Sequence, residues 1–248
     1  MATAADRRGR GPERAFARPL PCPAAGVVRL DDDEARHLVR VRRVRVGDPV
    51  VLFDGEGRAV RGHLARADAG ATEVAVEGEE TPRRPRRRVV VATAWPDGAR
   101  ADELVATLAE LGVEAVVPLR TARADPEGGE RAARRGERHA RLAREAAKVN
   151  GHARCLVVAP AQELAALLAG AAGGTRVLLD TDPDAPPLTD VVRGVADEVV
   201  LLVGPEGGFT DAEVAAAQAA GARVASVGGC ALRTETAAVA AAAVALAG

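Results

Sequence analysis

The chain has 248 residues, with 34 basic and 35 acidic side chains, three cysteines and no tyrosine. A chain of this length can bury one large or two modest cores, and it has too few cysteines for a small disulfide-bonded domain. No run approaches the ~20 continuous apolar residues that a bilayer-spanning helix needs, and residues 1–18 lack the apolar stretch of a signal peptide. We therefore expect a cytoplasmic protein with no membrane partner.

The cysteines and histidines do not indicate a metal site. Cys22, Cys155 and Cys230 are isolated, and the four histidines lack the i, i+4 spacing that places two ligands on one helix face. We expect reduced, mostly buried thiols and no metal.

The net charge of −1 hides an uneven distribution. Residues 1–88 carry 19 arginines against 14 acidic residues, whereas residues 149–248 carry 5 basic against 11 acidic residues. A basic N-terminal third favours a phosphate-backbone partner, because each arginine paired with a phosphate releases counterions. A solvated surface can have the same composition, so charge alone leaves both interpretations open.

The N-terminal third predicts a small β-rich module. Four acidic residues at 31–34 precede a short helix, where they interact favourably with the helix dipole. Two strand-like runs flank the glycine-containing turn 54–57 and predict a β-hairpin over 49–64. Residues 73–77 alternate with the period of a strand.

The pattern changes after residues 78–88, where two prolines and five arginines are typical of a linker. We expect domains at 1–80 and 81–248. In the second domain, short β-branched runs alternate with helix-length stretches, which predicts a mostly parallel sheet covered on both faces. The polar stretch 120–137 predicts a surface loop. The expected strands are 88–92, 114–118, 155–159, 176–180, 198–203 and 223–227.

A glycine-rich turn, Gly204-Pro-Glu-Gly-Gly208, follows the expected strand 198–203. Ligands of open parallel sheets bind beyond the carboxyl ends of the strands, and glycines let a ligand lie against peptide groups. The spacing matches neither a P-loop nor G-x-G-x-x-G. We expect a flat or anionic ligand, whose space a branched side chain at Gly207 would fill. Thr210 and Glu213 predict a capping box at the start of the next helix.

The last expected strand also ends at paired glycines, Gly228 and Gly229. A polar cluster follows and leads into an alanine-rich helix, for which Thr234 is the expected N-cap. Arg233 lies between Leu232 and this cap, a poor place for a merely solvated charge. We expect Arg233 to reach a carboxylate, a phosphate or a polar substrate edge.

Together, Gly204-Pro-Glu-Gly-Gly208 and Leu232-Arg-Thr-Glu-Thr-Ala237 resemble the SPOUT-class methyltransferases, most closely the RsmE-type family, which methylates N3 of a uridine in 16S ribosomal RNA. Ala35–Arg43 and Leu52–Gly55 resemble that family's N-terminal PUA-like RNA-binding domain. The resemblance covers nearly the whole chain. It implies an α/β fold in which a small β-rich PUA-like barrel precedes a SPOUT-like domain with a trefoil knot. It also implies a homodimer that uses S-adenosylmethionine without a metal.

The resemblance also implies roles for particular residues. Arg233 is the candidate for stabilising charge on the uracil ring, with binding of the donor's carboxylate as its alternative role. Glu206 is the candidate for accepting the N3 proton, with orientation of the loops as its alternative. Methyl-donor contacts are implied at Leu202, Gly204, Pro205, Glu206, Gly207, Gly208, Val227, Gly228, Ala231, Leu232 and Thr234. RNA contacts are implied at Arg36, Arg40, Arg42, Arg43, Arg100 and Arg123.

Three segments depart from the family's pattern. Trp95–Asp102 lacks the usual lysine and keeps Arg100, Lys148–His152 stands where Glu-Gln-Ser is usual, and Cys230-Ala231 replaces a bulkier pair. Two other functions therefore stay open, a SPOUT enzyme that methylates a ribose 2′-OH and an inactive RNA-binding ribosome-assembly factor. The expected partners are 16S rRNA or the small ribosomal subunit, and a second copy of the chain.

Overall fold

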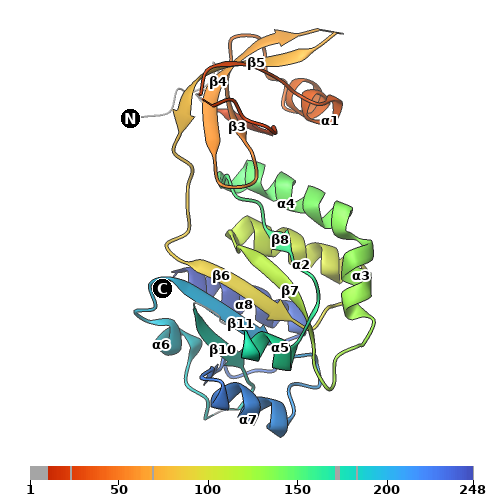
Figure 1. The fold of residues 1–248 in the computed structure, drawn as a ribbon, viewed down its shortest axis with the longest axis vertical. Helices are drawn as coiled ribbons and strands as arrows, with labels where there is room; N and C mark the ends of the chain where they lie inside the picture. Colours follow the sequence, from red (N-terminus) through yellow and green to blue (C-terminus); the bar gives the residue numbers. More distant parts are fainter. Residues whose placement is uncertain (1–10, 23, 69, 171–173, 183, 248) are drawn as a thin grey trace. The chain divides into compact units, whose positions relative to one another are not determined.

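The computed structural model describes residues 11–22, 24–68, 70–170, 174–182 and 184–247. Residues 1–10, where the N-terminal domain is expected to begin, lie outside these ranges. The described chain divides into two compact units (Figure 1). Unit 1 comprises the described residues up to Arg84 together with Arg144–Cys155, and unit 2 comprises Pro85–Ala143 and the described residues from Leu156 onward. No sequence pattern indicates that 144–155 belongs with unit 1.

Unit 1 is built on a sheet with strand order β1-β3-β4-β5-β2, in which only the β1–β3 pairing is parallel. The expected hairpin is confirmed, with β3 and β4 antiparallel and Leu52 opposite Val60. Gly55 and Gly57 between them have φ of +78° and +111°, which glycine adopts without strain. The strands are β1 (Glu13–Phe16), β2 (Gly26–Arg29), β3 (Pro49–Phe53), β4 (Ala59–Ala67) and β5 (Thr72–Glu80).

The short helix α1 (Asp32–Arg36) has the expected acidic N-terminus and continues into a π-helical turn, η1 (His37–Val41). Asp31 caps α1 by accepting a hydrogen bond from the Glu34 N–H at 2.8 Å. Buried Glu34 also accepts a bond from the Phe16 N–H and pairs with Nζ of Lys148 at 2.7 Å. The Lys148 side chain, the only lysine in the chain, is 3% exposed. This buried ion pair fastens the segment 144–155 to the rest of unit 1.

Unit 2 contains a parallel sheet with strand order β12-β10-β11-β6-β7-β8, and β9 adds a further parallel pairing to β7. The prediction of a mostly parallel sheet is confirmed, although the expected strand 155–159 shrinks to two residues. The strands are β6 (Arg88–Thr93), β7 (Ala115–Arg120), β8 (Val157–Val158), β9 (Gln162–Glu163), β10 (Thr175–Leu179), β11 (Glu198–Val203) and β12 (Arg223–Ala225).

Helices cover both faces of this sheet (Figure 1). On one face α8 contacts β6 and β11, with α2 and α6 beside it. On the other face, apolar side chains of α5 and α7 pack against the strands in one core cluster. The helices after β6 are α2 (Gly98–Leu111), α3 (Gly128–Arg134), α4 (Gly136–Asn150), α5 (Leu164–Ala169), α6 (Leu188–Val192), α7 (Asp211–Ala219) and α8 (Thr234–Ala247), and α4 belongs to unit 1 from Arg144 onward.

Two sequence-based expectations about local structure are wrong. The stretch 120–137, expected as a loop, contains α3, which buries Ala132 and two glycines and so has almost no apolar periodicity to reveal it. The cysteines are free but not mostly buried, because Cys22 and Cys230 are exposed in connecting segments and Cys155 is half-buried. Burial raises the pKa of the Cys155 thiol to about 11. Within the described ranges, no helix has the length and apolarity needed for a membrane crossing.

Candidate functional site

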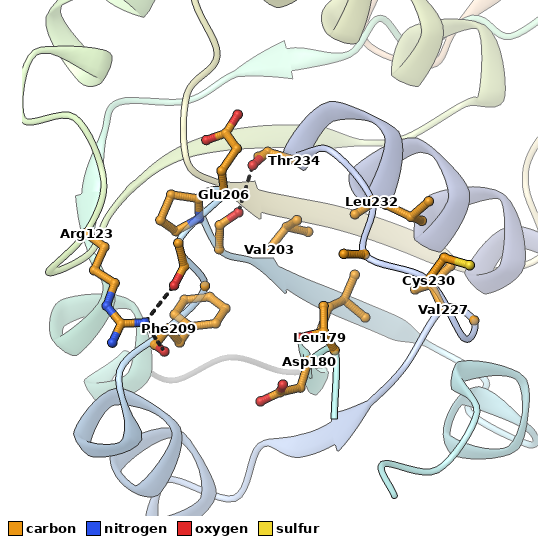
Figure 2. A pocket seen from close by; sticks show the side chains of 18 residues that line it. Arg123, Leu179, Asp180, Val203, Glu206, Phe209, Val227, Cys230, Leu232 and Thr234 are labelled. Atoms are coloured by element: carbon orange, nitrogen blue, oxygen red, sulfur yellow. Dashed lines mark hydrogen bonds between the residues drawn. The ribbon is translucent and has the colours of Figure 1, made fainter. Parts of the chain in front are cut away.

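A cavity of about 340 Å³, here called cavity A, lies beyond the carboxyl ends of β10, β11 and β12. Its walls come from residues 179–181 at the end of β10, from residues 203–209 at the end of β11, and from the segment that leads into α8 (Figure 2). That last segment contributes Val227, Gly228, Cys230, Ala231, Leu232 and Thr234. Ala237 in the first turn of α8 also lines it. Since glycines occupy much of the turn after β11, that wall consists largely of backbone.

Two polar side chains hold the glycine-rich turn in place (Figure 2). Arg123, from the segment after β7, donates hydrogen bonds to the carbonyl oxygens of Gly207 at 2.6 Å and Phe209 at 3.2 Å. The Thr234 hydroxyl donates to the carbonyl oxygen of Gly204 at 3.1 Å. The backbone of this turn is therefore positioned by side chains from two other segments before any ligand arrives.

The capping box predicted at Thr210 and Glu213 is confirmed at the start of α7. Glu213 also accepts a hydrogen bond from the Ala122 N–H at 2.8 Å. Partial burial opposes ionisation of Glu213, but these hydrogen bonds outweigh it and hold its pKa below the usual range. The charged carboxylate thus joins the segment after β7 to the helix that follows the glycine-rich turn.

Ten of the eleven residues expected to contact the methyl donor line cavity A. The exception is Leu202, which is fully buried in the core cluster that includes α5 and α7. Side chains alternate along β11, so Leu202 points into the sheet face rather than beyond the strand end. Sequence reasoning missed Asp180 and Thr181, which follow β10 but carry no motif, and it missed the wall residue Phe209.

Gly207 lines cavity A, and its carbonyl oxygen accepts the hydrogen bond from Arg123. A Cβ atom at Gly207 would meet Cδ of Arg123 at 3.3 Å, so a larger side chain there would also press on Arg123. The neighbouring Gly208 has a φ of +66°, so the backbone requirement for glycine lies there.

A second cavity of about 360 Å³, cavity B, adjoins cavity A and lies beyond the ends of β11, β6 and β7. Its lining is polar, and Arg131 forms an ion pair with Asp97 at 2.8 Å and donates a hydrogen bond to Asp125 at 3.1 Å. Arg131 therefore joins the segments that follow β6 and β7. Four residues line both cavities, namely Arg123, Pro205, Glu206 and Thr234.

One wall of cavity B is backed by a buried histidine. Trp95 lines the cavity and packs edge-to-face on His139, with ring centroids 5.6 Å apart. His139 is fully buried, and its Nε2 lies 3.4 Å from Oδ1 of Asp102, which also pairs with Arg135 and Arg138. Burial lowers the pKa of His139, and the two arginines add to this effect while Asp102 opposes it.

The depressed pKa of His139 predicts a loss of stability in mild acid. Below the ordinary histidine pKa of 6.5 the unfolded chain binds a proton that the native chain does not, so the free energy of unfolding falls as pH falls. Urea unfolding at pH values above and below 6.5 measures this slope. His139→Leu is expected to reduce it, leaving the part due to His152, whose pKa burial also lowers. Equal slopes in the wild type and in His139→Leu would contradict the assignment.

Arg233 and Glu206 are not brought together in this chain. Arg233 is exposed and lines neither cavity. Its carbonyl accepts a helical hydrogen bond from the Ala237 N–H at 2.8 Å, so Arg233 rather than the expected Thr234 lies at the cap position. Thr234 is the first residue of α8 and donates its hydroxyl proton to Gly204.

The six arginines expected to contact RNA lie in both units. In unit 2, Arg123 is bonded to the glycine-rich turn, and Arg100 lies 4.0 Å from Glu206. Both line cavity B. The four arginines of unit 1 are exposed on or beside α1 and η1, namely Arg36, Arg40, Arg42 and Arg43.

No cluster of three or more potential metal ligands occurs in the described part of the chain.

Comparisons with known proteins identify the family. Residues 82–246 match a family model described as an RNA methyltransferase domain, and residues 30–77 match one described as an RNA methyltransferase PUA domain. Ribosomal RNA small subunit methyltransferase E of Mycobacterium bovis is 31% identical over 222 residues, which cover 87% of this chain and 85% of the relative. The protein of the same name from Synechocystis is 31% identical over 217 residues, covering 85% and 69%.

Solved structures agree with this family. Ribosomal RNA small subunit methyltransferase E from Neisseria gonorrhoeae, bound to S-adenosyl methionine, has a TM-score of 0.82 at 29% identity, covering 94% of this chain and 95% of that one. A probable rRNA-methyltransferase from Porphyromonas gingivalis has a TM-score of 0.77 at 29% identity, covering 93% and 95%. The two cavities and the glycine-rich turn described above thus lie in a chain that belongs to the ribosomal RNA small subunit methyltransferase E family.

Proposed function

We propose that this protein transfers a methyl group from S-adenosylmethionine to N3 of a uridine in 16S rRNA. The observation that carries the proposal is cavity A, which lies at the carboxyl edge of a parallel sheet and is lined by both motifs of the family. The names of the relatives support rRNA as the substrate, and the donor bound to the Neisseria gonorrhoeae protein supports the choice of donor.

The residues of cavity A fit such a donor. S-adenosylmethionine, when bound, supplies a methyl group on a positively charged sulfur. The glycine-rich turn offers peptide groups that can hydrogen-bond the edge of an adenine ring, while Leu179 and Val203 offer apolar surface to its face. Asp180 supplies a carboxylate at the opposite wall that can accept hydrogen bonds from hydroxyl or ammonium groups (Figure 2).

The chemistry requires a proton acceptor, because uracil N3 carries a proton and is a poor nucleophile until that proton leaves. We assign this role to Glu206, a residue that lines both cavities. The N3–H bond breaks, the proton passes to Glu206, and the freed lone pair on N3 forms the bond to the methyl carbon as the carbon–sulfur bond breaks.

We further propose that unit 1 binds RNA as a PUA-like domain, and that the SPOUT-like domain contains a trefoil knot and pairs with a second copy in the cytoplasm. The family membership and the resemblance of both motifs support these assignments. We assign exposed Arg233 to a phosphate or substrate edge supplied from outside the chain, since it lines neither cavity. RNA contacts in unit 1 are assigned to Arg36, Arg40, Arg42 and Arg43.

Mass mapping of 16S rRNA from a strain that lacks the gene tests the proposed function. We expect one uridine base to lose a methyl group, and we expect the purified protein with S-adenosylmethionine to restore it at N3. A methyl group that instead makes the RNA backbone resist alkaline cleavage would indicate ribose 2′-O-methylation. Unchanged RNA together with no donor binding in calorimetry would indicate an RNA-binding assembly factor.

A further inference from the structure

Cavity B has the position that an acceptor site needs. Cavity A extends over β12, β10 and β11, whereas cavity B extends over β11, β6 and β7, so the two lie side by side along one edge of the sheet. The turn after β11 contributes Pro205 and Glu206 to both. A methyl group held in cavity A and a base held in cavity B would therefore meet at Glu206.

Of the three arginines that line cavity B, two are already committed to hydrogen bonds. Arg123 donates to the Gly207 carbonyl at 2.6 Å, and Arg131 donates to Asp125 at 3.1 Å and forms an ion pair with Asp97 at 2.8 Å. The guanidinium of Arg100 instead has two long ion-pair contacts, at 4.0 Å to Glu206 and 3.9 Å to Glu235. Both contacts exceed hydrogen-bond length, so Arg100 can turn its N–H groups to a ligand while remaining beside its counter-charges.

The two carboxylates around Arg100 differ in burial. The Glu235 side chain, in the first turn of α8, is 17% exposed, and within the described structure its Oε2 is buried without a hydrogen-bond partner. The Glu206 side chain is 66% exposed. Glu235 is thus the fixed counter-charge that holds Arg100 at the cavity, which leaves Glu206 to meet the substrate.

This arrangement complements the edge of one base. Around N3, uracil presents the acceptor O4, the donor N3–H and the acceptor O2. A carboxylate at N3 with a guanidinium beside it matches that order, and when the N3 proton leaves, the charge that spreads onto O4 and O2 faces the arginine. Cytosine has an amino group in place of O4 and no proton on N3. Its amino group would therefore face the N–H groups of Arg100, which are also donors.

We propose that Arg100 is a catalytic residue that donates hydrogen bonds to a carbonyl oxygen of the target uracil in cavity B and stabilises the negative charge formed as Glu206 takes the N3 proton. The inference rests on the proposed function and gives to Arg100 the role that the sequence suggested for Arg233. The segment Trp95–Asp102 departs from the family's pattern because it lacks the usual lysine, and Arg100 is the basic residue that remains in it.

The test compares the full-length protein with Arg100→Ala and Arg100→Lys on 16S rRNA transcripts made with uridine or with 5-fluorouridine, whose N3 is more acidic. Arg100 does not line cavity A, so donor affinity in calorimetry should stay at the wild-type value. On uridine RNA, Arg100→Ala should lower the single-turnover rate about 10²- to 10³-fold. On 5-fluorouridine RNA the loss should be at least tenfold smaller, because less stabilisation of the charge is then required.

The control is Arg134→Ala, an exposed arginine of α3 that lines neither cavity and should leave both rates unchanged. Because each variant is compared on two RNAs, partial misfolding cancels from the ratio. Equal losses of Arg100→Ala on both RNAs would overturn the inference in favour of a structural role, and a higher KM with an unchanged rate would overturn it in favour of a phosphate contact. A wild-type protein that forms no N3-methyluridine would overturn the proposed function as well, whereas wild-type activity retained by Arg100→Ala would overturn the inference alone.

Discussion

Replacement of Ala237 by phenylalanine is expected to abolish donor binding. Ala237 lines cavity A from the first turn of α8, and this helix is anchored by its contacts with β6 and β11. Because these contacts fix the position of the helix, the phenyl ring must occupy the part of cavity A that the ligand would fill. We expect the dissociation constant for S-adenosylmethionine to rise by at least ~100-fold, about 2.8 kcal/mol, in isothermal titration calorimetry.

Ala243 provides the matched control for this substitution. It lies on the same helix, is exposed and does not line cavity A, so Ala243→Phe should bind the donor as the wild type does. Thermal unfolding of both variants separates a blocked cavity from a misfolded protein. A folded Ala237→Phe protein with wild-type affinity would place the donor somewhere other than cavity A.

The second large effect is expected for Glu206→Gln. The amide keeps the size of the side chain but cannot accept the N3 proton, so the rate of methyl transfer should fall about 10²- to 10⁴-fold. Donor affinity should change little, because the turn around Glu206 is held by Arg123 and Thr234, which remain in place. Single-turnover transfer of a labelled methyl group to 16S rRNA measures the rate.

Asp211→Asn is the corresponding control, since Asp211 is an exposed carboxylate in the first turn of α7 that lines neither cavity. It should transfer methyl groups at the wild-type rate. A Glu206→Gln protein that is equally fast would remove Glu206 from proton transfer and turn attention to Asp97 and Asp125, the other carboxylates of cavity B.

Features that depend on short stretches of sequence could be predicted. The β-branched runs indicated the parallel sheet, and the capping box at Thr210 and Glu213 needs only residues three apart. The glycine-rich turn could be placed at a ligand site because carboxyl ends of parallel strands meet at one edge. These signals located most of the wall of cavity A.

Features that depend on distant contacts could not be predicted. Arg123 stood in a stretch interpreted as a loop, and nothing near it in sequence indicates that it binds the carbonyl of Gly207. Cavity B likewise depends on contacts between the segments after β6 and β7, such as the ion pair of Arg131 with Asp97 and the packing of Trp95 on His139. Arg233 was expected in the site because of its motif, but its side chain is exposed outside both cavities.

The return of the chain to unit 1 at 144–155 has a consequence for biosynthesis. Buried Glu34 forms its ion pair with Lys148, which the ribosome adds more than a hundred residues later. Until then its carboxylate lacks its counter-charge, and a buried charge without a partner costs about 3–5 kcal/mol. The amino-terminal unit therefore cannot reach its final stability as soon as its own strands have been made, and much of the nascent catalytic sheet is still untranslated when Lys148 arrives.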